Sequence, residues 1–483
     1  MSNAATGPLH IADGVSVILH IGLGAFHRAH QAVYLERLRA SGERDWMLCA
    51  GSIRADAVPQ LEALAAQGGA YTLETVTPEG EHSFERIEAI GHVVPFSPEL
   101  VELIELGADP HTKIISFTVT EAGYYLDDRG RLDRTAADLA ADLDGRTRRT
   151  IYGAVTAILH KRRVRDAGPV TLLNCDNLRH NGDCFGAGLR EFIALRGDHA
   201  LAAWLDENVT CPNAMVDRIT PRAAPDLPAR VRAATGRSDA APVMAESFLQ
   251  WVIEDRFCND RPPLERVGVQ FVESVQPYEE AKIRILNASH SCIAWAGSLR
   301  GYATIDQGVH DASIRQFAAD YVTRCVVPCL EHGCSPYPVD LARYRDTVLA
   351  RFGNAALRDT NRRVAMDGYS KIPGFIVPTI RECFELGVDP TPVMVLPALF
   401  FVFLQEWACG RLRDPYDDQV MDPERVRAML AAPDAEQAFV ADAQLWGTLA
   451  GQPRLQQAFD AALLRVRAWR TAAGAPSPTG SST

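Results

Sequence analysis

A strand, a glycine turn and a helix follow one another near the start of the chain. Residues 15–21 form a β-rich apolar run, the turn reads Gly22-Leu23-Gly24, and residues 26–39 have helical character. Glycines at such a turn let the backbone approach a pyrophosphate, and the helix that follows offers free N–H groups. The third glycine of the dinucleotide-binding fingerprint would stand at position 27, where this chain has His27. The turn alone therefore also fits a plain connection between strand and helix.

Further apolar runs indicate that this first strand belongs to an α/β sheet. The expected strands are residues 46–53, 71–76, 84–90, 113–119, 169–173 and 267–272. The turn Thr77-Pro78-Glu79-Gly80 predicts that the second and third of these runs form an antiparallel pair. A long helical stretch is expected from Arg134 to Arg163. The pattern predicts an α/β fold with a Rossmann-type N-terminal domain.

Polar side chains follow three of the expected strands at their carboxyl ends, which line the ligand crevice in an open parallel sheet. Asp56 would hydrogen-bond an adenosine ribose, whereas Arg54 beside it could accept a 2′-phosphate, so NAD is favoured only modestly. Thr120 and Glu121 are candidates for a cofactor wall. Asn177 could donate to an oxygen at the crevice, although its polar cluster also fits a turn or a helix cap.

The composition is that of a large acidic protein. The 483 residues are 47% hydrophobic, enough for two or three domains, and 49 Lys and Arg stand against 61 Asp and Glu, for a net charge of −12. This balance argues against nucleic acid or an anionic membrane as the main partner. The eleven cysteines are scattered, as is typical of reduced thiols, and residues 1–14 lack the pattern of a signal peptide. We therefore expect a cytoplasmic protein.

Two local patterns suggest other kinds of site. Cys325, Cys329, His332 and Cys334 could supply metal ligands, but their spacing matches no zinc pattern, and no metal is expected. The most apolar run, residues 392–404, is 13 residues long and contains a proline. It is too short for a membrane span and predicts a buried core helix.

From residue 278 onward the pattern changes to helices. Helical periodicity covers residues 279–300, 309–332, 340–352, 392–408, 422–430, 434–450 and 453–471. Residues 472–483 are Ala, Gly, Pro, Ser and Thr and are expected to be disordered. The chain should thus divide into a dinucleotide-binding domain over residues 1–278, a helical substrate and catalytic domain over residues 279–471, and this tail.

The stretch from Lys282 to His290 begins the helical half. At the helical period, Lys282, Asn287 and His290 fall within an arc of roughly 140° and rise roughly 12 Å along the axis. A long lysine side chain could then join the other two as a base, a hydrogen-bond donor and an orienting group. A helix with a solvated lysine and a satisfied histidine explains the same residues. A cleft between the two domains would contain both a cofactor and Lys282.

Five segments occur in an order that resembles the polyol-specific long-chain dehydrogenases, the mannitol dehydrogenase family. They are residues 22–31 (GLGAFHRAHQ), 118–124 (TVTEAGY), 175–178 (CDNL), 215–221 (MVDRITP) and 282–290 (KIRILNASH). The family has its own variant of the glycine turn, which includes the departure at position 27. The resemblance implies NAD-dependent, metal-independent oxidation of a secondary alcohol of an open-chain sugar alcohol to a ketose. D-arabinitol, giving D-xylulose, is the favoured substrate.

The resemblance also implies roles for single residues. Lys282 would be the general base, and Asn287 and Asn177 would polarise the reacting oxygen. His290 would bind a substrate hydroxyl, and Glu279 would connect the lysine to solvent. Other substrate oxygens would be held by Asp217, Arg363 and Lys371. The cofactor would contact Gly22, Gly24, Phe26, Arg28, Asp56, Thr120 and Glu121.

Other functions stay open at this point. Oxidation of D-mannitol to D-fructose, or reduction of a uronate or a sugar phosphate, would use the same fold, and the anionic substrates would need further cations in the cleft. A nucleotide-sensing protein could keep the fold and lose the chemistry. Such chains can work as monomers, so a monomer or a weak oligomer is expected.

Overall fold

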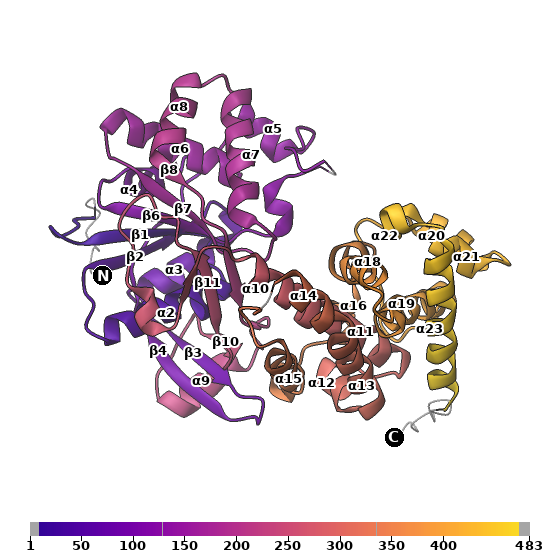
Figure 1. Cartoon of the computed structure of the whole chain (residues 1–483). Coiled ribbons are helices and arrows are strands. Elements are labelled where there is room, and N and C mark those ends of the chain that lie inside the picture. The colour runs from indigo at the N-terminus through magenta and orange to yellow at the C-terminus, as the bar shows by residue number, and fades with distance from the viewer. Residues whose placement is uncertain (1–8, 128, 335, 473–483) are drawn as a thin grey trace. The chain divides into compact units, whose positions relative to one another are not determined.

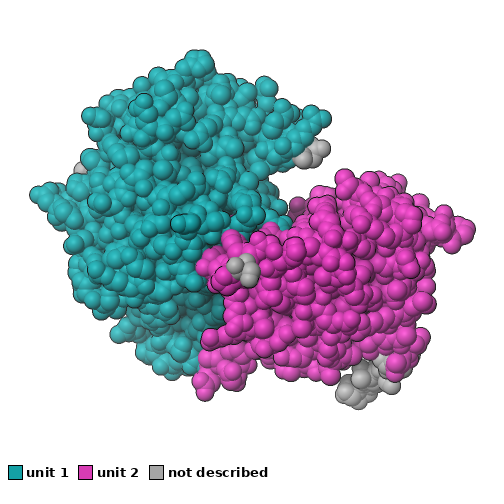
Figure 2. Space-filling model, viewed as in Figure 1, with its two compact units in different colours: residues 1–76, 82–276 teal, residues 77–81, 277–483 magenta. Residues whose placement is uncertain are grey.

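The chain forms two compact units, coloured separately in Figure 2. Each unit contains clusters of buried apolar residues of its own. The computed structural model describes residues 9–127, 129–334 and 336–472. Unit 1 comprises Met1–Val76 and His82–Gln276, and unit 2 comprises Thr77–Glu81 and Pro277–Thr483.

Unit 1 is built on a six-stranded sheet in which all neighbouring strands are parallel. Its strands are β1 (Ser16–Ile21), β2 (Trp46–Gly51), β5 (Ile90–Val93), β6 (Thr112–Phe117), β7 (Val170–Asn174) and β8 (Val209–Thr210). They stand in the order β5-β2-β1-β6-β7-β8, the doubly wound order of dinucleotide-binding folds, which reverses between β1 and β6. The predicted Rossmann-type fold is confirmed.

Helices cover both faces of this sheet (Figure 1). Val17, Leu19 and Ile21 of β1 pack in one apolar cluster and Ile18 in the other, because alternate residues of a strand point to opposite faces. The first cluster includes α4 (Val101–Gly107), α5 (Ala137–Leu143), α6 (Ile151–Arg165), α7 (Asn181–Leu195) and α8 (His199–Asn208). The second includes α1 (Ala25–Ala29), α2 (Gln31–Ala40) and α3 (Val58–Ala66). Strands covered on both faces have continuous apolar sequences, so the longer strands β1, β2, β6 and β7 were predictable.

Two small sheets complete unit 1. In one, β3 (Tyr71–Val76) pairs antiparallel with β4 (His82–Ile87) and parallel with β10 (Val243–Glu246), which confirms the predicted antiparallel pair. In the other, β11 (Gln250–Glu254) lies between β9 (Ala214–Asp217) and β12 (Gln270–Val272). The remaining elements are η1 (Ala55–Ala57), η2 (Glu121–Tyr124), α9 (Leu227–Thr235) and η3 (Leu264–Val267). Strands β5 and β8 to β11 were not predicted, because runs of two to five residues are too short to show a period.

Two predicted helices of unit 1 are each broken in two. The helix expected over residues 26–39 divides between α1 and α2 at His30, whose backbone leaves the helical region at φ −125° and ψ −85°. The stretch from Arg134 to Arg163 divides between α5 and α6. There Asp142 accepts hydrogen bonds from the backbone and the hydroxyl of Thr150, both over 2.8 Å. Such side-chain contacts compete with the helix but leave the apolar period unchanged, so the predictions of continuous helices were wrong.

Unit 2 is helical, as predicted. Its helices begin with α10 (Gln276–Ala281), η4 (Lys282–Asn287), α11 (Ala288–Leu299), α12 (Ile305–His310), α13 (Ala312–Tyr321), η5 (Val322–Val326), α14 (Val327–Gly333) and α15 (Leu341–Phe352). They continue with η6 (Ala355–Leu357), α16 (Asn361–Ala365), α17 (Gly368–Lys371), η7 (Ile372–Ile376), α18 (Val377–Leu386) and α19 (Thr391–Ala408). The last are α20 (Pro423–Ala431), α21 (Ala435–Val440), α22 (Ala443–Trp446), η8 (Gly447–Leu449) and α23 (Pro453–Ala472). The segment α16 to α18 was not predicted, because Gly and Pro interrupt its period. The predicted tail lies outside the described residues except for Ala472.

Helix α19 contributes the most apolar sequence to the core of unit 2. Its Phe400 packs against Trp295 of α11, with ring centroids 4.8 Å apart. The helix has 18 residues, more than the 13-residue apolar run suggested, and by length and composition it could cross a membrane. However, 78% of that window is buried inside the protein, so α19 is the core helix that the sequence predicted.

Candidate active site

Gly22 lies where the order of the central sheet reverses, just after β1. Its φ is +104°, in the region that favours glycine. A Cβ at Gly22 would lie 2.4 Å from the carbonyl oxygen of Thr118, the residue that follows β6. Thr118 in turn donates its hydroxyl to the Gly22 carbonyl oxygen over 2.8 Å. The two strand ends thus pack backbone against backbone at the switch point, as a dinucleotide site on this fold requires.

Two stacked histidines support the glycine turn. The rings of His20 in β1 and His27 in α1 lie 3.5 Å apart and 12° from parallel. His20 Nε2 lies 3.3 Å from the Gly22 carbonyl oxygen and 3.2 Å from Thr118 Oγ1. Burial lowers the pKa of His20 to about 3 and holds the pKa of His27 well below its usual value, so both rings are neutral. His27 therefore takes the place of the third glycine without opposing the fold of the turn.

The side chains that follow in α1 face the protein interior. Arg28 is buried and donates to the carbonyl oxygens of Gly24 and Ala241, so its guanidinium stabilises the turn. Phe26 stacks on His30 with centroids 5.0 Å apart. The predicted contacts of Phe26 and Arg28 with a cofactor stay predictions.

The other predicted cofactor residues are exposed at the ends of strands. Thr120 and Glu121 follow β6. Asp56 follows β2, and its side chain is 78% exposed, with Arg54 Nε 3.9 Å from its Oδ1. An acidic and a basic group therefore stand together at the position that distinguishes NAD from NADP.

Asn177 follows β7 in a loop that buried polar groups hold in place. Asp176 accepts hydrogen bonds from the Val119 backbone N–H over 2.6 Å and from the Tyr124 hydroxyl over 2.7 Å. Asn181 donates to the main-chain carbonyl oxygen of Asp176 over 3.0 Å. Burial raises the pKa of Asp176 to about 7. The loop that carries Asn177 is therefore fastened to the end of β6.

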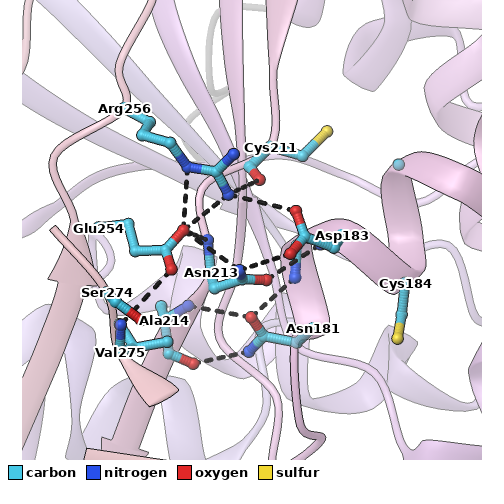
Figure 3. A network of polar contacts seen from close by, with 12 residues as sticks. Asn181, Asp183, Cys184, Cys211, Asn213, Ala214, Glu254, Arg256, Ser274 and Val275 are labelled. Carbon is cyan, nitrogen blue, oxygen red and sulfur yellow. Dashed lines mark hydrogen bonds and ion pairs between the residues drawn. The ribbon is translucent and has the colours of Figure 1, made fainter. Parts of the chain in front are cut away.

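A polar network links the start of α7 with strands β9 and β11 (Figure 3). Asn181 exchanges two hydrogen bonds with the backbone of Ala214 in β9, over 2.8 and 3.0 Å. Asn213 donates from its side chain to Glu254 at the end of β11 over 3.1 Å. These contacts fix β9, whose last residue is the predicted substrate ligand Asp217.

Asp217 and its neighbour Arg218 are both buried. Arg218 donates to the carbonyl oxygens of Ala29, over 2.6 Å, and Glu246, over 2.9 Å. Arg218 therefore makes these hydrogen bonds inside unit 1 and not at its surface.

The Lys282 stretch is not the regular α-helix that its spacing suggested. Residues Lys282–Asn287 form a π turn, in which Ala288 N–H donates to the carbonyl oxygen of Ile283, five residues earlier. Because a π turn joins residues five apart, Lys282 and Asn287 share one face instead of spanning the roughly 140° of an α-helix. The predicted angle between Lys282 and Asn287 around the helix axis was therefore wrong, and the angle in the π turn is smaller. Lys282 is 8% exposed.

His290 lies in a cluster of titratable groups in unit 2, in which His290 and Asp359 are largely buried and Arg363 is exposed. Its Nε2 lies 3.3 Å from Asp359 Oδ2, and its ring stacks on Phe352 with centroids 4.4 Å apart. Arg363 donates to both oxygens of the same carboxylate over 2.8 and 2.6 Å. Burial alone would raise the pKa of Asp359, but the nearby His290 and the hydrogen bonds from Arg363 hold this pKa well below its usual range. Burial lowers the pKa of His290, against the effect of Asp359.

Lys371 lies in the same cluster. Its Nζ donates to the Val364 carbonyl oxygen over 2.7 Å, and burial lowers its pKa to about 8. Arg363 and Lys371 both act electrostatically on His290, so three of the predicted substrate residues are neighbours. Glu279 is buried in α10.

Three residues that the sequence analysis missed organise these sites: His20, Asp176 and Asp359. His20 could have been noticed as the polar residue inside an apolar strand. Asp359 precedes Arg363 by four residues, the spacing of a helical ion pair. Asp176 gave no signal beyond its place next to Asn177.

Comparisons with known proteins give matches over both halves of the chain. The family model "Mannitol dehydrogenase Rossmann domain" matches residues 16–266, and "Mannitol dehydrogenase C-terminal domain" matches residues 274–467. D-arabinitol 4-dehydrogenase of Ralstonia nicotianae is 59% identical over 94% of this chain and 97% of that protein. D-arabinitol 4-dehydrogenase of Klebsiella pneumoniae is 54% identical over 89% of this chain and 94% of that protein. The ternary complex of Pseudomonas fluorescens mannitol 2-dehydrogenase with NAD and D-mannitol is 32% identical, with a TM-score of 0.81, covering 96% of this chain and 94% of that chain.

Proposed function

The chain belongs to the mannitol dehydrogenase family, and on this basis we propose that it oxidises D-arabinitol to D-xylulose with NAD as the hydride acceptor. The family resemblance carried by five short segments is confirmed. Within the family, residues 118–125 indicate D-arabinitol 4-dehydrogenase, and two proteins of that name are more than half identical to this chain. The mannitol 2-dehydrogenase structure is less similar, at 32% identity.

The π turn at Lys282 is the observation that carries the proposed chemistry. NAD, when bound, takes the hydride from the carbinol carbon. The substrate hydroxyl must then give up its proton, and the oxygen that becomes negative must be stabilised. We assign the proton to Lys282 Nζ and the stabilisation to the amides of Asn287 and Asn177. Amides are neutral donors and do not compete with the lysine for the proton.

The remaining polar groups hold the substrate in this proposal. His290, oriented by Asp359, binds one substrate hydroxyl. Arg363 and Lys371, the neighbours of that histidine, bind others. A polyol offers several hydroxyls that both donate and accept, so a set of fixed donors can read their stereochemistry. Asp217 supplies an acceptor for a further hydroxyl, and Glu279 connects Lys282 to solvent.

The test is a comparison of catalytic efficiency for D-arabinitol, D-mannitol, D-sorbitol and xylitol, each with NAD and with NADP. D-arabinitol with NAD should give the highest kcat/KM, and the product should be identified as D-xylulose. A higher kcat/KM for D-mannitol, with D-fructose as product, would favour the mannitol 2-dehydrogenase alternative. Activity confined to a uronate or a sugar phosphate would point to the reductases of this fold. Cofactor binding without turnover of any of these substrates would favour a sensor.

The proposal has two further parts, the cofactor preference and the oligomeric state. The strictness of the NAD preference depends on Arg54 and Asp56, which stand together after β2. We expect a preference for NAD without complete rejection of NADP, and the NADP arm of the same comparison measures it. We also expect a cytoplasmic monomer or weak oligomer, which sedimentation at several concentrations would test.

A further inference from the structure

The carboxylate of Asp176 joins the ends of two neighbouring strands. Its Oδ1 accepts the backbone N–H of Val119, after β6, over 2.6 Å, and its Oδ2 accepts the hydroxyl of Tyr124 over 2.7 Å. Asp176 itself stands directly before Asn177, after the end of β7. The proposed chemistry assigns no role to this side chain, although it is a buried titratable group where the strand ends form the ligand crevice.

The hydrogen bonds around Asp176 fit its ionised form. Asn174 donates to the Tyr124 oxygen over 2.7 Å, which leaves the hydroxyl hydrogen of Tyr124 for Asp176. Together with the Val119 N–H, this makes both carboxylate oxygens acceptors. Both donors are neutral, so the charge is unfavourable in this buried place, in keeping with a pKa raised by burial to about 7. Asparagine would fill the same volume without charge, but it has one acceptor oxygen for two donors.

The two hydrogen bonds that Asp176 accepts from Val119 and Tyr124 are called the Asp176 tie below. This tie is also connected to the glycine turn. Val119 follows Thr118, whose hydroxyl donates to the Gly22 carbonyl oxygen and whose own carbonyl lies against the Cα of Gly22. On the other side, Asn181 holds the main-chain carbonyl of Asp176. A shift of Asp176 would therefore change the path of the chain at Asn177 and at the end of β6 together.

We propose that Asp176 is a positioning residue for the dehydrogenase reaction: its carboxylate fixes the ends of β6 and β7 and thereby the amide of Asn177. The inference rests on the proposed function, in which Asn177 donates to the reacting oxygen. A misplacement of about 1 Å can reduce the rate by about a hundredfold. Loss of the tie should therefore lower kcat by about tenfold to a hundredfold, with little change in the KM for the polyol.

The test compares three substitutions in one buried cluster. Asp176→Asn and Tyr124→Phe both remove a contact of the tie. Tyr152→Phe is the matched control, because the buried Tyr152 hydroxyl donates to the carbonyl oxygen of Tyr124, over 3.1 Å, and not to Asp176. The two tie variants should lose kcat while the KM for the polyol stays close to wild type, and the control should keep its kcat. If Asp176→Asn does not fold, the test uses the kcat of Tyr124→Phe.

Hydrogen exchange measured by mass spectrometry supplies a readout that does not depend on turnover. The peptide that contains Val119 should exchange faster in Asp176→Asn than in wild type, and it should not do so in Tyr152→Phe. Wild-type kcat in both tie variants, or an equal loss of kcat in the control, would overturn the proposal. If the wild-type protein oxidises no polyol at all, the proposed function fails, and unchanged exchange at Val119 then separately overturns the tie.

Discussion

Replacing Gly22 with alanine should displace the turn at the end of β1, destabilise the protein and weaken NADH binding. The φ of +104° is unfavourable for any residue with a Cβ. The added carbon would also stand 2.4 Å from the carbonyl oxygen of Thr118 and 2.9 Å from its Oγ1. Thr118 cannot yield easily, because its own N–H donates to the Ile21 carbonyl oxygen over 3.0 Å. Either the turn or the end of β6 must move.

The size of the effect follows from the backbone strain at Gly22 and from the close contact with Thr118. A strained backbone conformation of this kind costs about 1 to 3 kcal/mol by itself, and the contact with Thr118 adds to it. A total of at least ~2 kcal/mol corresponds to a fall in Tm of about 4 to 8 °C for a domain of this size class. Because the displaced atoms are those at the sheet's switch point, NADH affinity should fall at least tenfold.

The measurement is thermal unfolding together with NADH binding followed by fluorescence. Gly24→Ala is the control in the same turn, because Gly24 has φ −93° and a Cβ there would have its nearest neighbour, the Gly22 carbonyl oxygen, 3.8 Å away. We expect the control to keep its Tm. The reasoning from the close approach would be refuted if Gly22→Ala kept the wild-type Tm and NADH affinity. It would also be refuted if Gly24→Ala lost as much Tm as Gly22→Ala.

Three further predictions concern unit 2. Lys282→Ala should abolish NAD-linked polyol oxidation and leave NADH binding intact; undiminished turnover would exclude the lysine as base. Asp359→Asn should destabilise the protein at neutral pH. The depressed pKa of Asp359 contributes stability above the unfolded value of about 3.9 that is lost as the pH falls below it, so urea unfolding of the variant should depend less on pH in that acid range. Lys371, with a pKa of about 8, loses its charge as the pH rises through that value. The KM for the polyol should accordingly rise above pH 8 in wild type, and a KM in Lys371→Met with the same pH dependence would argue against a role for this charge.

Local sequence patterns were sufficient to predict the helices and strands that bury long apolar runs. The strand before Gly22, the glycine turn itself and the helical half after residue 278 each show a period or a composition within a short window, since burial selects apolar residues at regular spacing. Asn177 was proposed as a polar group that follows such a run, whereas Lys282 and Asn287 were proposed from their helical spacing, and the family resemblance supplied their roles.

The tertiary structure decided where these residues point and what holds them. The π turn at Lys282 has an ordinary helical sequence, and only the backbone hydrogen bond from Ala288 to Ile283 shows that the backbone departs from the α-helical period. Asp359 reaches His290 across 69 positions of sequence, and Asp176 reaches Val119 across 57. A sequence window reports periodicity because burial is repeated locally. It carries no trace of a single hydrogen bond between distant residues, so the tie that fixes Asn177 became visible only in the folded chain.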